Sequence, residues 1–163
     1  MSELVAGSIQ HATGSWYFAC SERGLETVSH NPIFDVPELD EHPLVRKHAH
    51  ALVQVLDGEV ENYPLPMQLE GTAFQKKVWQ AIAAIGFGET KSYADIARGL
   101  GGNAVRAVGT ACGANPLPIA IPCHRVIRSD GGLGGFGMGG IEKKEKLLGF
   151  ERSYKKSSKK KAA

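Results

Sequence analysis

A proline-rich break at residues 63–66 (Tyr-Pro-Leu-Pro) divides this chain of 163 residues into two stretches with different patterns. Before the break, three short apolar runs separated by glycine-containing turns predict strands at residues 5–9, 16–20 and 25–28. Apolar residues at helical spacing after Pro43 then predict one helix. A chain of this length can bury one compact core, or pack a small domain against a second of moderate size.

Helix start signals and glycine turns dominate the chain after the break. Capping boxes begin at Thr72 and Ser92, and each predicts a helix. After the glycine pair at residues 101–102, Asn103 predicts the N-cap of a further helix over residues 104–114. Two short helices joined by a glycine turn are typical of a helix-turn-helix.

The last third of the chain alternates irregular and helical segments. A short strand is predicted at residues 119–121. Seven of the ten residues 131–140 are glycine, which predicts a loop whose backbone can approach a ligand closely. A final helix is predicted over residues 141–150, followed by a lysine-rich segment that we expect to be flexible.

These patterns together predict an α/β (α+β) fold in three parts. Residues 1–69 form a small sheet-plus-helix accessory domain, and residues 70–151 form a mainly helical domain that carries the function. Residues 152–163 form a flexible, lysine-rich tail.

The net charge of +2 hides a strong asymmetry, because residues 1–70 carry a net −8 and residues 71–163 a net +10. A polyanion-binding surface is therefore expected in the C-terminal half.

No apolar run approaches the ~20 residues of a membrane span, and the N-terminus lacks a secretory pattern. Three cysteines without framework spacing favour a reducing compartment. We expect a cytoplasmic protein without a membrane partner, in a bacterial or archaeal cytosol, or a nuclear one in a eukaryote.

Cys123 is the first candidate for chemistry, because His124 and Arg125 follow it directly. A thiol becomes a strong nucleophile when a base or a positive field converts it to the thiolate. Adjacent side chains often point to opposite sides, so a proton relay from Cys123 to His124 would need a bridging water. The alternative is a buried structural cysteine, which is what we expect of Cys20 and Cys112.

Two other motifs are weaker. Residues 132–137 match G-x-G-x-x-G, but a dinucleotide site needs a complete βαβ unit and a later acidic residue, so no nucleotide cofactor is predicted. His48 and His50 lie two apart in the predicted helix and face different directions, and no Cys-x-x-Cys partner exists. We therefore expect solvated surface histidines rather than a zinc site.

Basic residues support a DNA-binding role for the predicted helix-turn-helix. Arg106 lies near the start of the second helix, the end that such helices present to DNA. Other basic residues of the same half are predicted to bind phosphates. They are Lys76, Lys77, Lys91, Arg98, Arg125 and Arg128.

Several segments after the break are more specific than these general signals. In order they are FQKKVW at 74–79, GETKSY at 88–93, RAVG at 106–109, NP at 115–116, IPCHRV at 121–126 and LLxxE at 147–151. This order closely resembles the O6-alkylguanine-DNA alkyltransferases (methylated-DNA–protein-cysteine methyltransferases), over residues 70–151. The matched segments imply that the second half has the family's winged helix-turn-helix-like fold. By position alone, the N-terminal half resembles the family's RNase H-like accessory domain.

The resemblance implies a DNA repair reaction that each molecule performs once. A monomer would bind double-stranded DNA from the minor groove and flip out O6-alkylguanine, or O4-alkylthymine. Cys123 would then displace the alkyl group in line, and because the resulting thioether is not hydrolysed, the protein would be consumed. No cofactor is implied.

The resemblance also assigns roles to single residues. Glu151 would orient His124 in a Cys–water–His–Glu relay. Tyr93 would crowd the 3′ phosphate and donate to guanine N3, and Arg106 would fill the vacated base stack. Further matched positions are Ala94, Asn103, Gln75 and Ser129 for DNA binding, and Asn115 (the hinge), Pro118, Val126, Phe136, Gly137 and Met138 for the pocket.

The sequence departs from the family pattern at the pocket and at a metal site. Phe136 stands where the family usually has a tyrosine, and Gly137 and Met138 replace a small polar residue, which leaves the accepted alkyl size open. Ser21 and Glu26 occupy two of the places where some members carry zinc ligands, so no structural metal is predicted.

Two other functions stay open on the sequence. An alkyltransferase-like protein recognises the lesion without repairing it, although such proteins replace the nucleophile that this chain keeps at Cys123. An unrelated cysteine hydrolase would use Cys123 and His124, but it gives no account of Arg106, Tyr93 or the helix-turn-helix.

Overall fold

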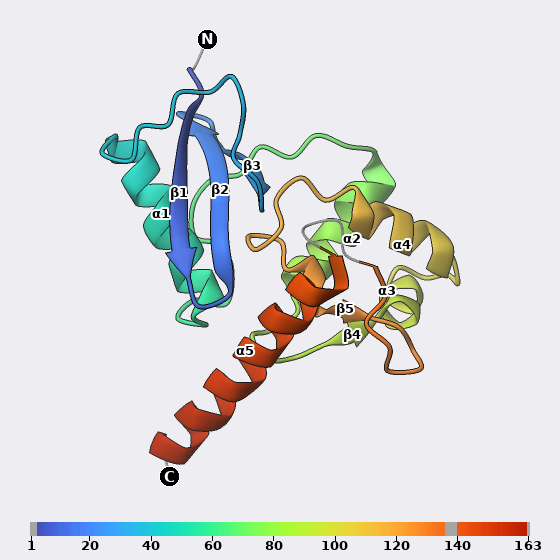
Figure 1. The fold of residues 1–163 in the computed structure, drawn as a ribbon. Coiled ribbons are helices and arrows are strands. Elements are labelled where there is room, and N and C mark those ends of the chain that lie inside the picture. The colour runs from blue at the N-terminus through green and yellow to red at the C-terminus, as the bar shows by residue number, and fades with distance from the viewer. Residues whose placement is uncertain (1–2, 136–139, 163) are drawn as a thin grey trace.

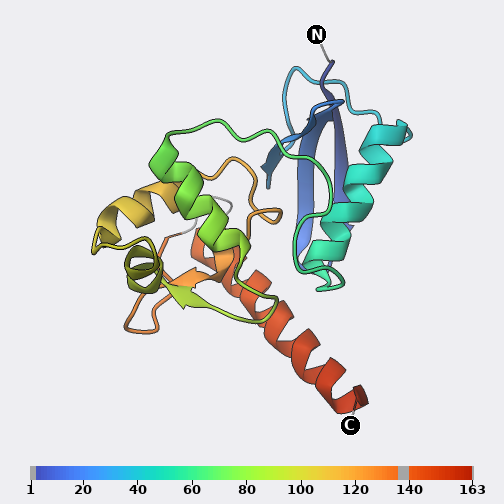
Figure 2. The same cartoon turned by 180° about the vertical axis from the view of Figure 1, so that it is seen from behind.

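The computed structural model describes residues 3–135 and 140–162, which form a mixed α/β fold with two bodies side by side (Figure 1). The first body is an antiparallel sheet, in the order β1-β2-β3, with α1 against one face (Figure 2). Its elements are β1 (Val5–His11), β2 (Gly14–Ser21), β3 (Gly24–Ser29) and α1 (Pro43–Leu56). The three strands and the helix predicted before the proline-rich break are confirmed, with longer strands.

The core between the sheet and α1 is closely packed. Trp16 and Phe18 of β2 and Leu52 of α1 are completely buried. At Gly7 of β1 the helix approaches the sheet so closely that a β-carbon would overlap Val45 Cγ1 and lie 2.8 Å from Phe18 Cζ. A glycine in the middle of this strand is therefore required by the distance between the two layers.

His48 was expected to be a solvated histidine, and this expectation is wrong. Its side chain is buried on the same stripe of α1 as Val45 and Leu52, because positions three and four apart in a helix share a face. The imidazole Nδ1 is hydrogen-bonded to the Tyr63 hydroxyl, and the two rings are stacked with centroids 5.9 Å apart. Burial lowers the pKa of His48.

The proline-rich break is fixed to the sheet rather than free. The amide of Leu25 donates to the carbonyl of Pro66 over 2.9 Å, and the amide of Gln68 donates back to Leu25 over 2.8 Å. Residues from both sides of the break contribute to one continuous hydrophobic core. The division of the chain into 1–69, 70–151 and 152–163 stays a prediction.

The second body is mainly helical. The capping boxes predicted at Thr72 and Ser92 are confirmed, and a two-stranded parallel sheet joins β4 to β5. The helices α3 and α4, with a glycine turn between them, form the predicted helix-turn-helix (Figure 1). The elements are α2 (Ala73–Ala83), β4 (Lys91–Ser92), α3 (Tyr93–Gly99), α4 (Val105–Gly113), the 3-10 turn η1 (Cys123–Arg125), β5 (Val126–Ile127) and α5 (Gly140–Ala162).

Two local predictions in this body are wrong. Ala104, not Asn103, holds the N-cap position of α4, and no side chain caps it; the Asn103 carbonyl instead accepts from the amide of Val105 over 2.8 Å. Residues 119–121 form a turn rather than a strand, and Ile119 has a φ of 76°. An apolar run of three residues does not distinguish a strand from a buried turn.

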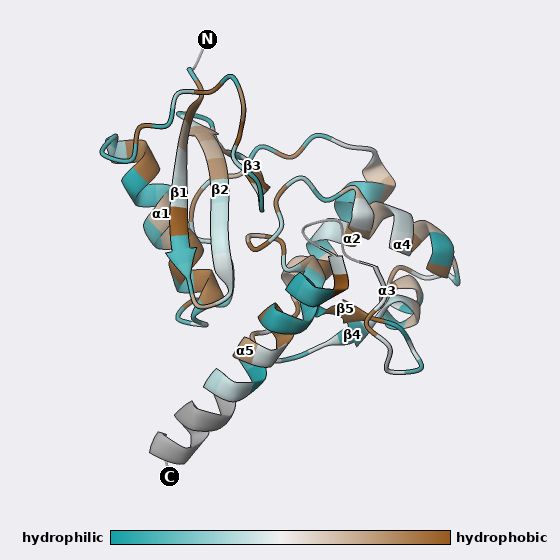
Figure 3. Ribbon diagram, viewed as in Figure 1, coloured by the Kyte–Doolittle hydropathy of each residue, from teal (hydrophilic) through white to brown (hydrophobic). Residues whose placement is uncertain are grey.

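The helix α5 extends beyond its predicted end at Phe150 and continues to Ala162. No proline or glycine follows Gly149, and lysine is a good helix former, so no residue type in the segment stops the helix. Hydrophobic and hydrophilic residues alternate along the part of α5 that contacts the β1–β2 hairpin and the turn η1 (Figure 3). Among the described residues, no helix has the length and apolar character that crossing a membrane requires.

The substitution Gly7→Ala should destabilise the N-terminal body by about 1–3 kcal/mol, because overpacking pushes α1 away from the sheet. The melting temperature should fall by about 2–4 °C for each kcal/mol. Gly102→Ala is the matched control, because no atom lies within 4 Å of a β-carbon built there. Equal melting temperatures for the two variants, measured by calorimetry, would show that the layers are looser than described.

Candidate active site

Cys123 lies on the wall of a cavity of about 570 Å³ between the helix-turn-helix and the glycine-rich loop. The residue is 8% exposed and stands at the start of the turn η1. The residues that line the cavity are Tyr93, Val105, Arg106, Gly109, Thr110, Cys112, Gly113, Asn115, Cys123 and Gly135. The thiol is thus accessible from the cavity, on the side where the predicted DNA-contacting helix begins.

Asn115 holds the backbone that leads to Cys123. Its Nδ2 donates to the carbonyl of Ile121 over 2.8 Å, and its Oδ1 accepts from the amide of Leu117 over 2.9 Å. The amide of Cys123 donates to the same Ile121 carbonyl over 2.7 Å. The side chain thereby connects the end of α4 to the turn η1, in keeping with the hinge role that the resemblance implies for Asn115. Pro118 is buried in the turn of residues 118–120, between Asn115 and η1.

His124 and Arg125 share one buried carboxylate. The Nε2 of His124 is hydrogen-bonded to Glu151 Oε2, as the relay requires. Arg125 donates from Nε to Glu151 Oε1 over 2.8 Å and from a terminal nitrogen to Oε2 over 3.2 Å. Gly88 donates its amide to Oε1 over 2.9 Å. The pair of His124 and Glu151 predicted from the sequence is therefore within hydrogen-bond contact.

The prediction that Arg125 binds a DNA phosphate is wrong. Its side chain is 2% exposed, and besides Glu151 it donates to the carbonyl of Ile85 over 2.7 Å. The guanidinium also lies over the ring of Phe87, 5.8 Å from its centroid. Arg125 balances the charge of Glu151 inside the protein, because an unpaired buried carboxylate would be very costly.

The protonation states follow from this burial. Desolvation raises the pKa of the Cys123 thiol, against the opposing effects of the Asn115 hydrogen bond and the charge of Lys144. Desolvation also lowers the pKa of His124, although Glu151 opposes it. For Glu151, burial acts to raise the pKa, but His124 and Arg125 outweigh it and lower the pKa to about 2. At neutral pH the resting centre holds a thiol, a neutral imidazole and a carboxylate.

The neutral imidazole has a defined tautomer. Because Nε2 of His124 faces the Glu151 carboxylate, it carries the proton, and Nδ1 is left as the basic nitrogen. Within residues 3–135 and 140–162, the buried Nδ1 has no hydrogen-bond partner. This nitrogen is the one that can take a proton from Cys123.

Lys144 is a site residue that the sequence did not reveal. Its side chain is completely buried, and its ammonium group donates to the carbonyls of Val126, over 2.6 Å, and of Leu133. It also lies 3.5 Å from the Tyr93 hydroxyl. The available signal was spacing, because Lys144 precedes Leu148 by four residues and Glu151 by seven, on the buried side of α5.

Tyr93 stands at the N-terminus of α3, half-buried and against the glycine-rich loop. A β-carbon at Gly134, where φ is 73°, would lie 2.9 Å from the Tyr93 hydroxyl, so the loop approaches the ring only because it has a glycine there. Desolvation, with smaller contributions from Cys112 and Cys123, raises the pKa of Tyr93 to about 12. The phenol therefore stays protonated and able to donate.

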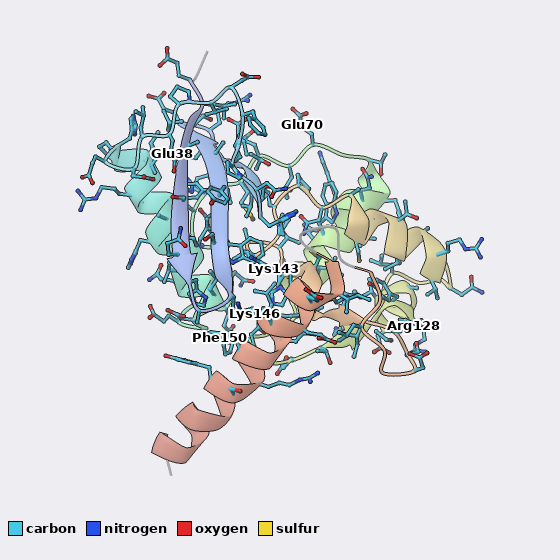
Figure 4. All side chains as sticks on the ribbon, in the orientation of Figure 1. Glu38, Glu70, Arg128, Lys143, Lys146 and Phe150 are labelled. Carbon is cyan, nitrogen blue, oxygen red and sulfur yellow. The ribbon has the colours of Figure 1, made fainter. Side chains whose placement is uncertain are left out.

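The predicted DNA-contacting residues are distributed over several elements of the second body, and of these Tyr93 and Arg106 line the cavity. Arg106 is exposed in the first turn of α4, and a groove of about 750 Å³ beside it is lined by Gln75 and Asn103 as well. Ser129 lines a smaller hollow with Tyr93 and Arg128. Ala94 is half-buried in α3. Lys76, Lys77, Lys91, Arg98 and Arg128 are exposed, and Figure 4 shows Arg128 on the loop after β5.

Phe136, Gly137 and Met138 lie outside the described residues, whereas Val126 is buried in β5 beside Lys144. Within the part of the chain that the structure describes, no three His, Cys, Asp or Glu side chains are grouped as metal ligands.

The substitution Glu151→Gln tests the buried carboxylate. At pH 7 the variant should be less stable by about 3 kcal/mol, because the Glu151 pKa is about 2 in the folded protein against 4.5 for an unperturbed group. A carboxyl with a depressed pKa stabilises the fold above about pH 5, and this contribution is lost as the pH falls towards 2. Urea denaturation should therefore show the two proteins converging on acidification.

Glu145→Gln is the control for this experiment, because Glu145 is exposed on the same helix. A stability difference between Glu151→Gln and the parent that stays constant from pH 7 to pH 3 would contradict the assigned pKa of Glu151.

Comparisons with known proteins identify the family of the chain. The sequence profile of the 6-O-methylguanine DNA methyltransferase DNA-binding domain matches residues 73–153. A methylated-DNA–protein-cysteine methyltransferase of Mycolicibacterium paratuberculosis is 45% identical over 102 residues, which are 62% of this chain and 61% of that protein. The constitutive methyltransferase of that name from Bacillus subtilis is 46% identical over 120 residues, or 72% of this chain and 73% of that protein.

The fold is also shared along nearly the whole chain. The crystal structure of Mycobacterium tuberculosis OGT in complex with DNA superposes with a TM-score of 0.78 and 34% identity, covering 91% of this chain and 93% of that one. The match to the M. paratuberculosis protein, by contrast, spans only about three-fifths of its length. The resemblance seen in the sequence is confirmed, and the chain belongs to the methylated-DNA–protein-cysteine methyltransferases, the O6-alkylguanine-DNA alkyltransferase family.

Proposed function

We propose that this protein repairs DNA by transferring the alkyl group of O6-alkylguanine, and of O4-alkylthymine, to Cys123. The observation that carries the proposal is the position of Cys123, which faces a cavity that Arg106 also lines and lies next to the hydrogen-bonded pair of His124 and Glu151. Relatives with the same name and a neighbour solved with DNA support it. The reaction consumes the protein and makes it a single-turnover methyltransferase.

Base flipping brings the lesion to the thiol. An alkyl group on O6 is out of reach inside a stacked duplex, and extruding the nucleotide costs a few kcal/mol. Arg106 is exposed at the start of α4 and can enter the stack from the minor groove, while Tyr93 crowds the phosphate backbone. A single copy of the chain presents these groups together, so we propose that it acts as a monomer, in the cytoplasm with its DNA.

The transfer itself is a displacement at the alkyl carbon. The sulfur of Cys123 forms a bond to that carbon as the bond between carbon and guanine O6 breaks, and the electron pair leaves with the guanine. The thiol proton passes through a water molecule to Nδ1 of His124, and the Glu151 carboxylate stabilises the imidazolium. Tyr93, with its raised pKa, donates a hydrogen bond to guanine N3 as negative charge builds up on the base.

Mass spectrometry tests the proposal directly. Protein incubated with duplex DNA that contains O6-methylguanine should gain the mass of one methyl group, located on Cys123, and no more than one. Cys123→Ala should bind the same DNA without gaining mass, whereas Cys20→Ala, in the core of the sheet, should still be methylated.

Other outcomes separate the competing functions. Tight binding without transfer would show a lesion-recognition protein, and several turnovers for each molecule would show a hydrolase. Either result would overturn the assignment.

Arg106→Ala should slow repair of duplex DNA by about 10- to 1000-fold, because the variant cannot hold the flipped state. Its reaction with the free base O6-benzylguanine, which needs no flipping, should change little. Arg23→Ala is the charge-matched control, because Arg23 is an exposed arginine of the N-terminal body. Quenched time courses on both substrates would give the ratio of the parent rate to the variant rate. Equal slowing on both substrates would contradict the flipping role of Arg106.

A further inference from the structure

The helix α5 contacts two different parts of the protein along two adjacent rows of residues. Lys143 and Phe150, seven residues apart, contact the hairpin of β1 and β2. Lys144 and Glu151, each one position later, contact the catalytic centre. Positions seven apart lie two turns apart on the same side of a helix, so each row is continuous. The hairpin and the catalytic centre are therefore connected through one rigid element.

The side chain of Lys143 packs against the β1–β2 hairpin instead of extending into solvent. Its ammonium nitrogen lies 4.3 Å from the centroid of the Trp16 ring and 3.5 Å from the carbonyl oxygen of Ser15. Gly14, at the turn, leaves room for it, because a β-carbon there would overlap the ammonium group. Partial burial lowers the pKa of Lys143. Figure 4 shows Lys143 on α5 beside the lower part of β2.

Phe150 makes the second contact of the same row. Its ring meets His11 edge-on, with centroids 4.8 Å apart. His11 is itself fixed, since its two ring nitrogens lie 2.9 Å from the Thr13 hydroxyl and 2.7 Å from the carboxylate of Asp57 at the end of α1. The end of the hairpin is thus held against α1. It contacts α5 at Lys143 and at Phe150, which lie two helical turns apart.

The second row depends on how α5 is rotated about its axis. Lys144 must reach the carbonyls of Val126 and Leu133, and Glu151 must reach His124. A small rotation of the helix would move both side chains together. Contacts on the row of Lys143 and Phe150 resist that rotation, because successive residues of a helix keep a fixed angular relation.

We propose that the β1–β2 hairpin positions Glu151 and Lys144 for the reaction by fixing the rotation of α5, with Lys143 as the positioning residue. The proposal rests on the alkyl transfer proposed above and adds a role for the N-terminal body in that reaction. Lys143 touches neither DNA nor the reacting atoms in this role. It acts through Trp16 on one side and through the helix on the other.

The experiment compares Lys143→Ala with Lys143→Arg and Lys146→Ala. Arginine keeps a cation that can lie over the Trp16 ring. Lys146 has the same charge, is exposed, and lies one turn further along α5, so its replacement controls for lost charge (Figure 4). Methyl transfer is measured in a single turnover at saturating duplex DNA, and DNA affinity is measured separately. A thermal melt establishes that each variant is folded.

Lys143→Ala should transfer the methyl group about three- to ten-fold more slowly at saturating DNA, with unchanged affinity. Lys143→Arg should recover most of the rate, and Lys146→Ala should match the parent protein. Equal rates for Lys143→Ala and Lys146→Ala would overturn the proposal. A defect that disappears at saturating DNA would also overturn it, because Lys143 would then be a phosphate contact.

A second readout does not depend on alkyl transfer from DNA. Iodoacetamide alkylates the thiolate of Cys123, and mass spectrometry gives the rate at each pH. When Glu151 moves away from His124, the imidazole becomes a weaker base, so the pH profile of Lys143→Ala should shift to higher pH. A parent protein that transfers no methyl group refutes the proposed function, whereas an unshifted iodoacetamide profile refutes the positioning role.

Discussion

The carboxylate of Glu151 is the buried charge on which the arrangement of the catalytic centre depends. It accepts hydrogen bonds from His124, Arg125 and the amide of Gly88, and so joins α5 to the turn η1 and to the loop before β4. A buried carboxylate needs such partners, because its desolvation is repaid only by close, well-directed donors. The contacts that hold three segments of the fold together are therefore the ones that orient the base His124.

In the proposed reaction, this arrangement would keep Cys123 unreactive until a lesion is in place. Burial favours the neutral thiol of Cys123 and the neutral imidazole of His124, so the resting protein holds little thiolate. A permanently ionised cysteine would react with any small electrophile or oxidant that entered the cavity. If each molecule transfers one alkyl group, as we propose, such a side reaction would consume it. Proton transfer to His124 at the moment of displacement avoids it.

The features that depend on residues close together in the chain could be predicted from the sequence. The capping boxes at Thr72 and Ser92 use neighbours three residues away, and the segment around Cys123 has its base next to it. Arg125 and Lys144 could not be predicted in the same way. Both are cations, which normally lie on the surface, and their burial depends on a carboxylate or on carbonyl groups far away in the chain. Asn103 has a strong capping tendency, yet its carbonyl rather than its side chain accepts from Val105, and Ala104 takes the N-cap position of α4.

The charge asymmetry of the chain can be related to the place of the N-terminal sheet in the structure. Residues 1–70 carry a net −8, and a negative surface is repelled by DNA, so the N-terminal sheet is suited to a place away from the phosphates. It still contacts the working part through α5, where Trp16 and His11 meet Lys143 and Phe150. If the N-terminal sheet stays away from the substrate, it contributes through contacts of this kind. The face of α5 that carries Lys143 and Phe150 is therefore one place where the acidic half can influence the proposed reaction, and the hydrogen bond from the amide of Val28 to the carbonyl of Pro116 is another.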